Sequence, residues 1–181
     1  MTHFAVTAVG ADRPGIVAAV TGVFAEQGCN LEDSSMTILR GQFAMMLVVD
    51  APAGVDAGQL EAALAGPAAD LDLVVTVRPA PEPVPGSASA DEEVSWTVSV
   101  YGADHPGIVH GVASLLAARN VNIVDLSTRV VGAAENPVYT MVLEVTLPSG
   151  TDPREFERAL ADRAGELGVT CRLHPSEADI L

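Results

Sequence analysis

One short segment of the sequence carries residue types that could bind a charged small molecule, and the chain contains it twice. Its sequence is GADRPGIV at Gly10–Val17 and GADHPGIV at Gly102–Val109. A helix that starts here would present backbone N–H groups without intrahelical partners, and such groups attract a carboxylate. The aspartates of the two copies, Asp12 and Asp104, could meet an ammonium group. Together these groups predict a place for a zwitterion, that is, for an amino acid.

The glycines and prolines of this segment predict its backbone. Gly10 and Gly102 are expected to let the chain leave a strand with an unusual backbone angle. The prolines that follow are expected to start a helix, because the missing N–H of proline would have had no intrahelical partner there. Gly15 and Gly107 leave the first turn without side-chain cover. The alternative interpretation is a purely structural cap, in which the aspartate itself hydrogen-bonds the first-turn amides.

The repeat extends far beyond this segment. The same offset of 92 residues places Asn30 on Asn122, and further along an offset of 96 places Phe43 on Tyr139. A four-residue insertion around residues 132–137 accounts for the change in offset. A register that holds over such a length predicts that the chain is a tandem duplication.

The two copies are separated by a segment of different composition. Residues 81–93 are rich in proline, serine and acidic side chains and show no apolar periodicity, which is typical of an extended linker. We therefore predict a first domain at 1–80, the linker at 81–93, a second domain at 94–176 and a tail at 177–181.

Each copy shows the same order of predicted elements. In the first copy, alternation and helical periodicity predict strands at 3–9, 30–39, 43–50 and 71–78 and helices at 14–28 and 56–64. In the second copy, the corresponding strands are at 94–101, 121–131, 138–147 and 169–174 and the helices at 106–119 and 152–167. The order βαββαβ predicts an α+β fold of the ferredoxin-like type, with four antiparallel strands and two helices on one face.

Composition excludes several classes of function. The chain has 181 residues and a formal net charge of −15, and all 9 of its basic residues are arginine. The absence of lysine from the sequence excludes Schiff-base and P-loop lysine chemistry. An acidic chain without clustered positive charge is not expected to bind nucleic acid directly.

The remaining residue patterns give no catalytic or metal-binding set. The sequence holds 2 cysteines, too few for a disulfide scaffold or a structural zinc site. The four histidines lack the spacing of a metal motif, and no serine lies in a nucleophile frame. We therefore expect no catalytic residues, no metal and no cofactor. No apolar run is long enough for a membrane span and no secretory signal is visible, so a cytoplasmic protein is expected.

The repeated loop, the helix after it and the segment GCNLED or NVNIVD closely resemble the ACT domain, a small regulatory module of βαββαβ fold. The resemblance covers both copies. Two such domains with no catalytic domain attached resemble the glycine-cleavage-system transcriptional repressor family. This resemblance implies a non-enzymatic regulatory protein that binds an amino acid at interfaces between paired domains. It also implies indirect transcriptional control of glycine or one-carbon metabolism through a protein partner.

The alternative is a detached regulatory subunit of an amino-acid-metabolic enzyme, and the ligand, the protein partner and a homodimer are left open. In ACT domains the first loop and helix start face the ligand, and the second-strand asparagine of a partner domain can complete the site. Carried over to this chain, the resemblance implies these ligand-binding residues: Gly10, Asp12, Arg13, Gly15, Ile16 and Asn30 in the first copy, and Gly102, Asp104, His105, Gly107, Ile108 and Asn122 in the second.

Overall fold

The computed structural model describes residues 2–80, 95–132 and 137–176. The chain divides into two compact units, which we call the N-terminal unit and the C-terminal unit, with the division between Pro85 and Gly86. The predicted linker at 81–93, most of the predicted insertion and the predicted tail at 177–181 lie outside the described residues.

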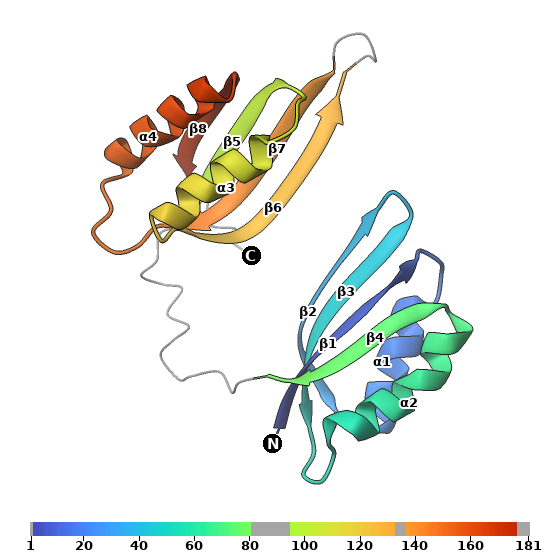
Figure 1. Cartoon of the computed structure of the whole chain (residues 1–181). Helices are drawn as coiled ribbons and strands as arrows, with labels where there is room; N and C mark the ends of the chain where they lie inside the picture. The colour runs from blue at the N-terminus through green and yellow to red at the C-terminus, as the bar shows by residue number, and fades with distance from the viewer. Residues whose placement is uncertain (1, 81–94, 133–136, 177–181) are drawn as a thin grey trace. The chain divides into compact units, whose positions relative to one another are not determined.

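Both units have the element order βαββαβ, and Figure 1 shows both helices of each unit on one side of its sheet. The N-terminal unit consists of β1 (Thr2–Ala11), α1 (Ile16–Glu26), β2 (Asn30–Leu39), β3 (Gln42–Ala51), α2 (Ala57–Asp70) and β4 (Leu73–Pro79). The C-terminal unit consists of β5 (Ser95–Ala103), α3 (Ile108–Ala118), β6 (Asn122–Val131), β7 (Val138–Thr146), α4 (Pro153–Glu166) and β8 (Val169–Pro175). The predicted fold class is confirmed.

The sheets have the strand orders β2-β3-β1-β4 and β6-β7-β5-β8, and all neighbouring strands are antiparallel. The core of each unit lies between the sheet and its two helices. In the N-terminal unit Phe4, Val6 and Ala8 point from β1 into this core and meet Ile16 and Phe24 of α1. Because successive strand residues point to opposite faces, the residues between them lie on the face that no helix covers.

The edge strands β2 and β6 share an irregularity. The pairing register shifts between Leu31 and Asp33 in β2 and between Ile123 and Asp125 in β6, so one extra residue bulges from each strand. Every residue of β2 is exposed. The bulge occupies the same position in both copies of the duplication, and after it the side chain of Asp33 lies on the face without helices, together with its partner Val48.

Helix α2 is longer than predicted. The prediction ends this helix at Leu64, whereas α2 continues through Pro67 to Asp70. Proline inside a helix removes one backbone hydrogen bond. The helix continues because Ala68 in its last turn and Leu71 directly after its end pack against the core. This burial offsets the lost hydrogen bond.

Gly10 and Gly102 are required by packing rather than by backbone angle, so the predicted unusual angle is wrong. Both residues lie in regular strand pairing, and neither has a left-handed φ. A Cβ atom at Gly10 would lie 2.7 Å from the carbonyl oxygen of Asp72 and 2.7 Å from Cδ2 of Leu73. At Gly102 it would lie 2.8 Å from Val169. The glycines therefore allow the last strand of each unit to approach the first.

We predict that Gly10→Ala destabilises the N-terminal unit by about 1–3 kcal/mol, because the added methyl group would overlap backbone atoms that cannot move independently. The control is Gly22→Ala in α1, where a Cβ meets no other atom within 4 Å. This change should leave stability equal or raise it by roughly 0.5–1 kcal/mol. Urea unfolding of both variants measures the difference. Equal stability of the two variants would show that β4 can shift freely.

Candidate functional site

Each helix that follows the repeated loop begins two residues later than the predicted proline start. Helix α1 begins at Ile16 and α3 at Ile108. The residues before them, Gly15 and Gly107, have φ values of 97° and 100°. This left-handed conformation cannot belong to a right-handed helix and favours glycine, so the helix starts only after it. The prolines lie in the turn that leads to these glycines.

The first turns of α1 and α3 are open. In the part of the chain that the structure describes, neither Asp12 nor Asp104 donates or accepts a side-chain hydrogen bond at the first-turn amides, so the capping alternative is not observed. A Cβ atom built on Gly15 or Gly107 meets no other atom within 4 Å. The space beside these glycines is therefore free, and a carboxylate could approach the first-turn N–H groups, which have no intrahelical partners.

The side chains near the N-terminal loop divide between solvent and core. Asp12 and Arg13 are exposed, and the backbone N–H of Asp12 donates to the carbonyl oxygen of Gly41 in the β2–β3 turn at 2.8 Å. The side chain of Ile16 is only 1% exposed, and that of Ile108 in the other copy 2%. These isoleucines belong to the core, and only their amides remain available to a ligand.

In the C-terminal unit the loop is tied down by a histidine. Nε2 of His105 lies 2.7 Å from the carbonyl oxygen of Leu167, at the end of α4. A carbonyl oxygen only accepts, so the imidazole donates here. The residue at the same position in the N-terminal copy, Arg13, is exposed and makes no such contact among the described residues. The side chain of His105 is therefore used to hold the loop against α4.

A second difference between the two units lies in the core, near the loop. Tyr139 is buried at the position that Phe43 occupies in the N-terminal unit. Burial raises the pKa of the Tyr139 phenol, and the carboxylate of Asp104 raises this pKa further. A hydroxyl group thus lies near the acidic residue of one loop, whereas the other loop has only an aromatic ring there. The two candidate sites are not chemically equivalent.

The asparagines implied by the resemblance lie far from the loops of their own units. Asn30 pairs with Asp50, and Asp50 pairs with His3 at the beginning of β1. The loop follows Gly10 at the other end of β1, which at about 3.3 Å per residue is more than 20 Å away. Asn122 begins β6 in the same way. Within each unit the implied set therefore divides into a loop group and a separate asparagine.

One polar cluster was not found by sequence reasoning. Nε2 of His3 lies 3.2 Å from Oε2 of Glu32, and Nδ1 of His3 and Oδ1 of Asp50 are buried without a hydrogen-bond partner in the described part of the chain. The second copy has Ser95 and Thr146 at the positions of His3 and Asp50, so the cluster belongs to one copy only. Its members are adjacent through strand pairing and not through sequence spacing, which explains why the sequence did not indicate it.

The described residues contain no group of three His, Cys, Asp or Glu side chains placed to hold a metal ion. Both thiols are free. Burial raises the pKa of Cys171 to about 11, so this thiol is protonated at neutral pH and is a poor nucleophile. Burial also raises the pKa of Cys29, and the nearby carboxylate of Asp50 adds to the effect. These environments are those of structural cysteines.

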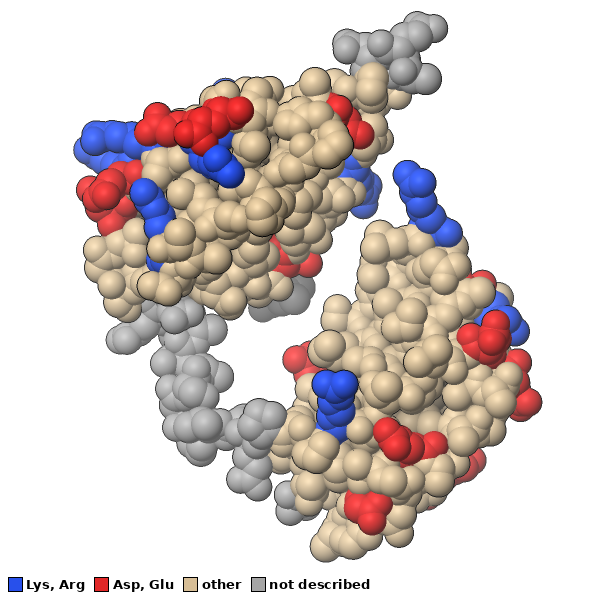
Figure 2. Space-filling model, in the orientation of Figure 1, with Lys and Arg blue, Asp and Glu red and all other residues tan. Residues whose placement is uncertain are grey.

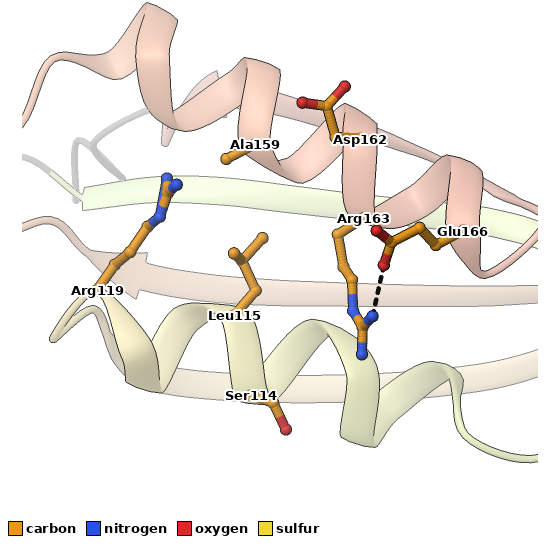
Figure 3. Close-up of a pocket in the computed structure, with 7 residues that line it drawn as sticks. All are labelled: Ser114, Leu115, Arg119, Ala159, Asp162, Arg163 and Glu166. Atoms are coloured by element: carbon orange, nitrogen blue, oxygen red, sulfur yellow. Dashed lines mark hydrogen bonds and ion pairs between the residues drawn. The ribbon is translucent and has the colours of Figure 1, made fainter.

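A groove of about 440 Å³ lies between α3 and α4 on the helical face of the C-terminal unit (Figure 3). Two arginines, Arg119 and Arg163, line it. Arg163 is already engaged: its Nε donates to the carbonyl oxygen of Gly111 at 3.2 Å, and a terminal guanidinium nitrogen lies 2.6 Å from Glu166. No residue of the β5–α3 loop lines this groove. The groove is therefore separate from the candidate ligand site.

Comparison with protein families gives a match in each unit. Residues 2–78 and residues 96–154 each match a model of the ACT domain. Over 174 residues the chain is 30% identical to the glycine cleavage system transcriptional repressor of Escherichia coli (strain K12), and the match covers 92% of this chain and 86% of that protein. A UPF0237 protein of Methanopyrus kandleri is 47% identical over 78 residues, which is 41% of this chain and 87% of that protein.

The same similarity extends to solved structures. The crystal structure of a protein from Galdieria sulphuraria, described as unknown, is 28% identical and superposes with a TM-score of 0.80. The superposition covers 97% of this chain and 99% of that one. The structure also contains no described helix that is long and apolar enough to cross a membrane.

We predict that His105→Ala destabilises the C-terminal unit by about 1 kcal/mol, because it removes the hydrogen bond between the imidazole and the carbonyl of Leu167. The matched control is Arg13→Ala, which should change stability by less than about 0.5 kcal/mol, since Arg13 is exposed. Hydrogen exchange of the two loops, measured beside thermal melts, should show faster exchange only in the β5–α3 loop. Equal effects of the two substitutions would contradict the anchoring role.

Proposed function

Since this chain belongs to the ACT-domain family, and within it to the group of tandem proteins that includes the glycine cleavage system transcriptional repressor, we propose that it is a non-enzymatic regulator that binds an amino acid at its repeated loops. Ligand binding changes how the protein engages a protein partner. Through that partner the chain controls genes of glycine or one-carbon metabolism indirectly.

The observation that carries this proposal is the open helix start in each unit. Gly15 and Gly107 hold the chain in a left-handed conformation, and the amides after them have no side-chain cap. A carboxylate is the group that suits such amides, because the helix dipole adds to their hydrogen bonds. The exposed Asp12 and Asp104, which lie three residues before these glycines, supply the opposite charge for an ammonium group.

The asparagine proposed for the site has to come from a different unit than the loop. Asn30 and Asn122 each lie at the end of the strand opposite to the loop of their own unit. A ligand that contacts both a loop and an asparagine is therefore shared between two ACT domains. Such a ligand stabilises the pairing of those domains. The stabilisation equals the difference between its binding free energies for the paired and the separate state.

The charge of the chain supports indirect rather than direct control of transcription. The net charge of −15 opposes binding to the phosphate backbone of DNA, and the acidic side chains are distributed over both units (Figure 2). A DNA-binding partner would then supply the contacts to DNA. The free thiols Cys29 and Cys171 fit a reducing compartment, and we propose the cytoplasm as the location.

The test is calorimetric titration of the chain with amino acids, beginning with glycine, together with the variants Asp12→Asn and Asp104→Asn. Each variant should weaken binding at its own loop by about 1–3 kcal/mol, because it removes the charge that meets the ammonium group. The control is Asp70→Asn at the exposed end of α2, which should leave affinity unchanged. Full affinity in both loop variants would show that the ligand binds elsewhere, or that the loops have only a structural role.

A second measurement separates this function from the alternative of a detached enzyme subunit. The tagged chain is recovered from cells grown with and without the amino acid identified by titration. Our proposal predicts recovery of a DNA-binding protein in a ligand-dependent amount. Recovery of the catalytic subunit of an enzyme would support the alternative and contradict transcriptional control.

A further inference from the structure

The sheet of the N-terminal unit has a wide apolar face on the side opposite α1 and α2. Val9, Met46 and Val74 on this face are 46%, 55% and 70% exposed. A shallow hollow of about 370 Å³ lies over β1, β2 and β3. An apolar face of this size on a soluble domain is typical of an interaction surface.

The cross-strand register arranges this face in rows of four residues. In the strand order β2, β3, β1, β4, the three central rows are Asp33, Val48, Ala5 and Arg78; Ser35, Met46, Thr7 and Thr76; and Thr37, Ala44, Val9 and Val74. Only Asp33 and Arg78 carry a charge among these positions. They belong to the same row and lie at opposite edges of the sheet.

We propose that two copies of this chain pair through this face, sheet against sheet, about a two-fold axis that runs along the strands. Such an axis places β2 of one copy over β4 of the other and β3 over β1. Each row then meets the same row in reverse order. Asp33 therefore faces Arg78 of the second copy, and the symmetry forms this ion pair twice. Between the two pairs, Val48 lies over Ala5 of the second copy, and in the next row Met46 lies over Thr7 of the second copy.

The charged side chains at the Asp33 and Arg78 end of the face are arranged in the same complementary way. The acidic side chains at this end of the face, Glu32, Asp33 and Asp50, lie on β2 and β3. The basic side chain Arg78 lies on β4, and His3 lies on β1, where its Nε2 is 3.2 Å from Glu32 of its own copy. The proposed axis brings the acidic half of one copy over the basic half of the other. The face is thus complementary to itself, with an apolar centre and a polar rim as in known interfaces.

The corresponding face of the C-terminal unit carries more charged side chains. We therefore propose that the N-terminal face pairs with the same face of a second copy. Glu144, Arg172 and Arg129 stand where the N-terminal face has Val48, Thr76 and Thr37. Charged side chains lose hydration when they are buried against apolar groups and are costly there without a partner. An uncharged centre such as Met46 and Val9 fits best against another uncharged centre.

The size of the face is sufficient for a stable pair. Four strands about 4.8 Å apart and roughly ten residues long at about 3.3 Å per residue span about 20 Å by 30 Å. Two such faces bury on the order of 1,200 Å², which is the lower end of the range for stable protein–protein interfaces. The ordinary twist of the two sheets allows them to stack at an angle of about 30°.

The first test uses charge exchange at the ion pair, with sedimentation velocity of the full chain as the measurement. The wild-type chain should form a dimer. Asp33→Arg alone places two cations together, and Arg78→Asp alone places two anions together, so each variant should weaken dimerisation at least about tenfold. An equimolar mixture of the two variants should dimerise again, because both ion pairs are restored in the mixed dimer.

The matched control for this exchange is Asp125→Arg, which changes the corresponding position on β6 and should leave dimerisation unchanged. Circular dichroism checks that all variants are folded. A wild-type chain that remains a monomer up to sub-millimolar concentration would overturn the proposal. A dimer that both single variants preserve, or a mixture that fails to recover, would overturn it equally.

The second test concerns the apolar centre and does not depend on the ion pair. Met46→Glu places a charge in the middle of the interface and should abolish dimerisation. Val142→Glu makes the same change at the corresponding exposed position of the C-terminal face and should preserve it. Neither residue lies in a loop proposed to bind an amino acid, so titration with ligand remains interpretable whatever the outcome. Dimerisation of Met46→Glu at wild-type strength would contradict the proposed face.

Discussion

The exit from the first strand of each unit is the constraint on which the site depends. Gly10 and Gly102 have no room for a side chain, because the last strand of the unit packs directly against them. The chain then has to turn onto the helical face within a few residues, and the left-handed glycine before α1 or α3 completes that turn. This conformation leaves the first-turn amides without a cap. The same geometry that closes the core therefore opens the helix start to a ligand.

The two units share apolar core positions, although Leu116 and Tyr139 stand where the first copy has Phe24 and Phe43, and they differ in charge at outward positions. The helix starts Ile16 and Ile108 are buried to the same degree. By contrast, Arg13 and His105 differ in their contacts, and Val48 on one uncovered sheet face is replaced by Glu144 on the other. Close packing restricts core changes, because even a methylene group is felt there, whereas exposed positions tolerate exchange. The differences in charge and in hydrogen bonding between the two units therefore lie mainly in the loops and on the uncovered sheet faces.

Element order could be predicted because the repeat supplied two independent copies of each periodic pattern. Three features could not be predicted. The helix starts were placed at the prolines, since the statistical preference of proline for the first turn does not reveal that the next glycine has a positive φ. The distance of Asn30 from the loop of its own unit follows from strand pairing, which places it beside Asp50, and not from sequence spacing. The apolar face was hidden because β3, with Met45 inside and Met46 outside, is apolar on both faces and shows no alternation.

The loop and the uncovered face of the N-terminal unit are connected through a single strand. Val9 lies in the row farthest from Asp33 and Arg78, and Asp12 follows it three residues later, just beyond the end of β1. A ligand that orders the loop therefore acts next to one end of the proposed interface. By linkage, the ligand strengthens pairing of two copies only as much as pairing strengthens binding of the ligand. In the proposed pair each row meets the same row, so Asn30 of the second copy lies at the His3 and Asp50 end of the face, away from the loop. An asparagine that completes the loop site therefore has to come from a different pair of domains, and the ligand and the sheet-face pairing are coupled through β1.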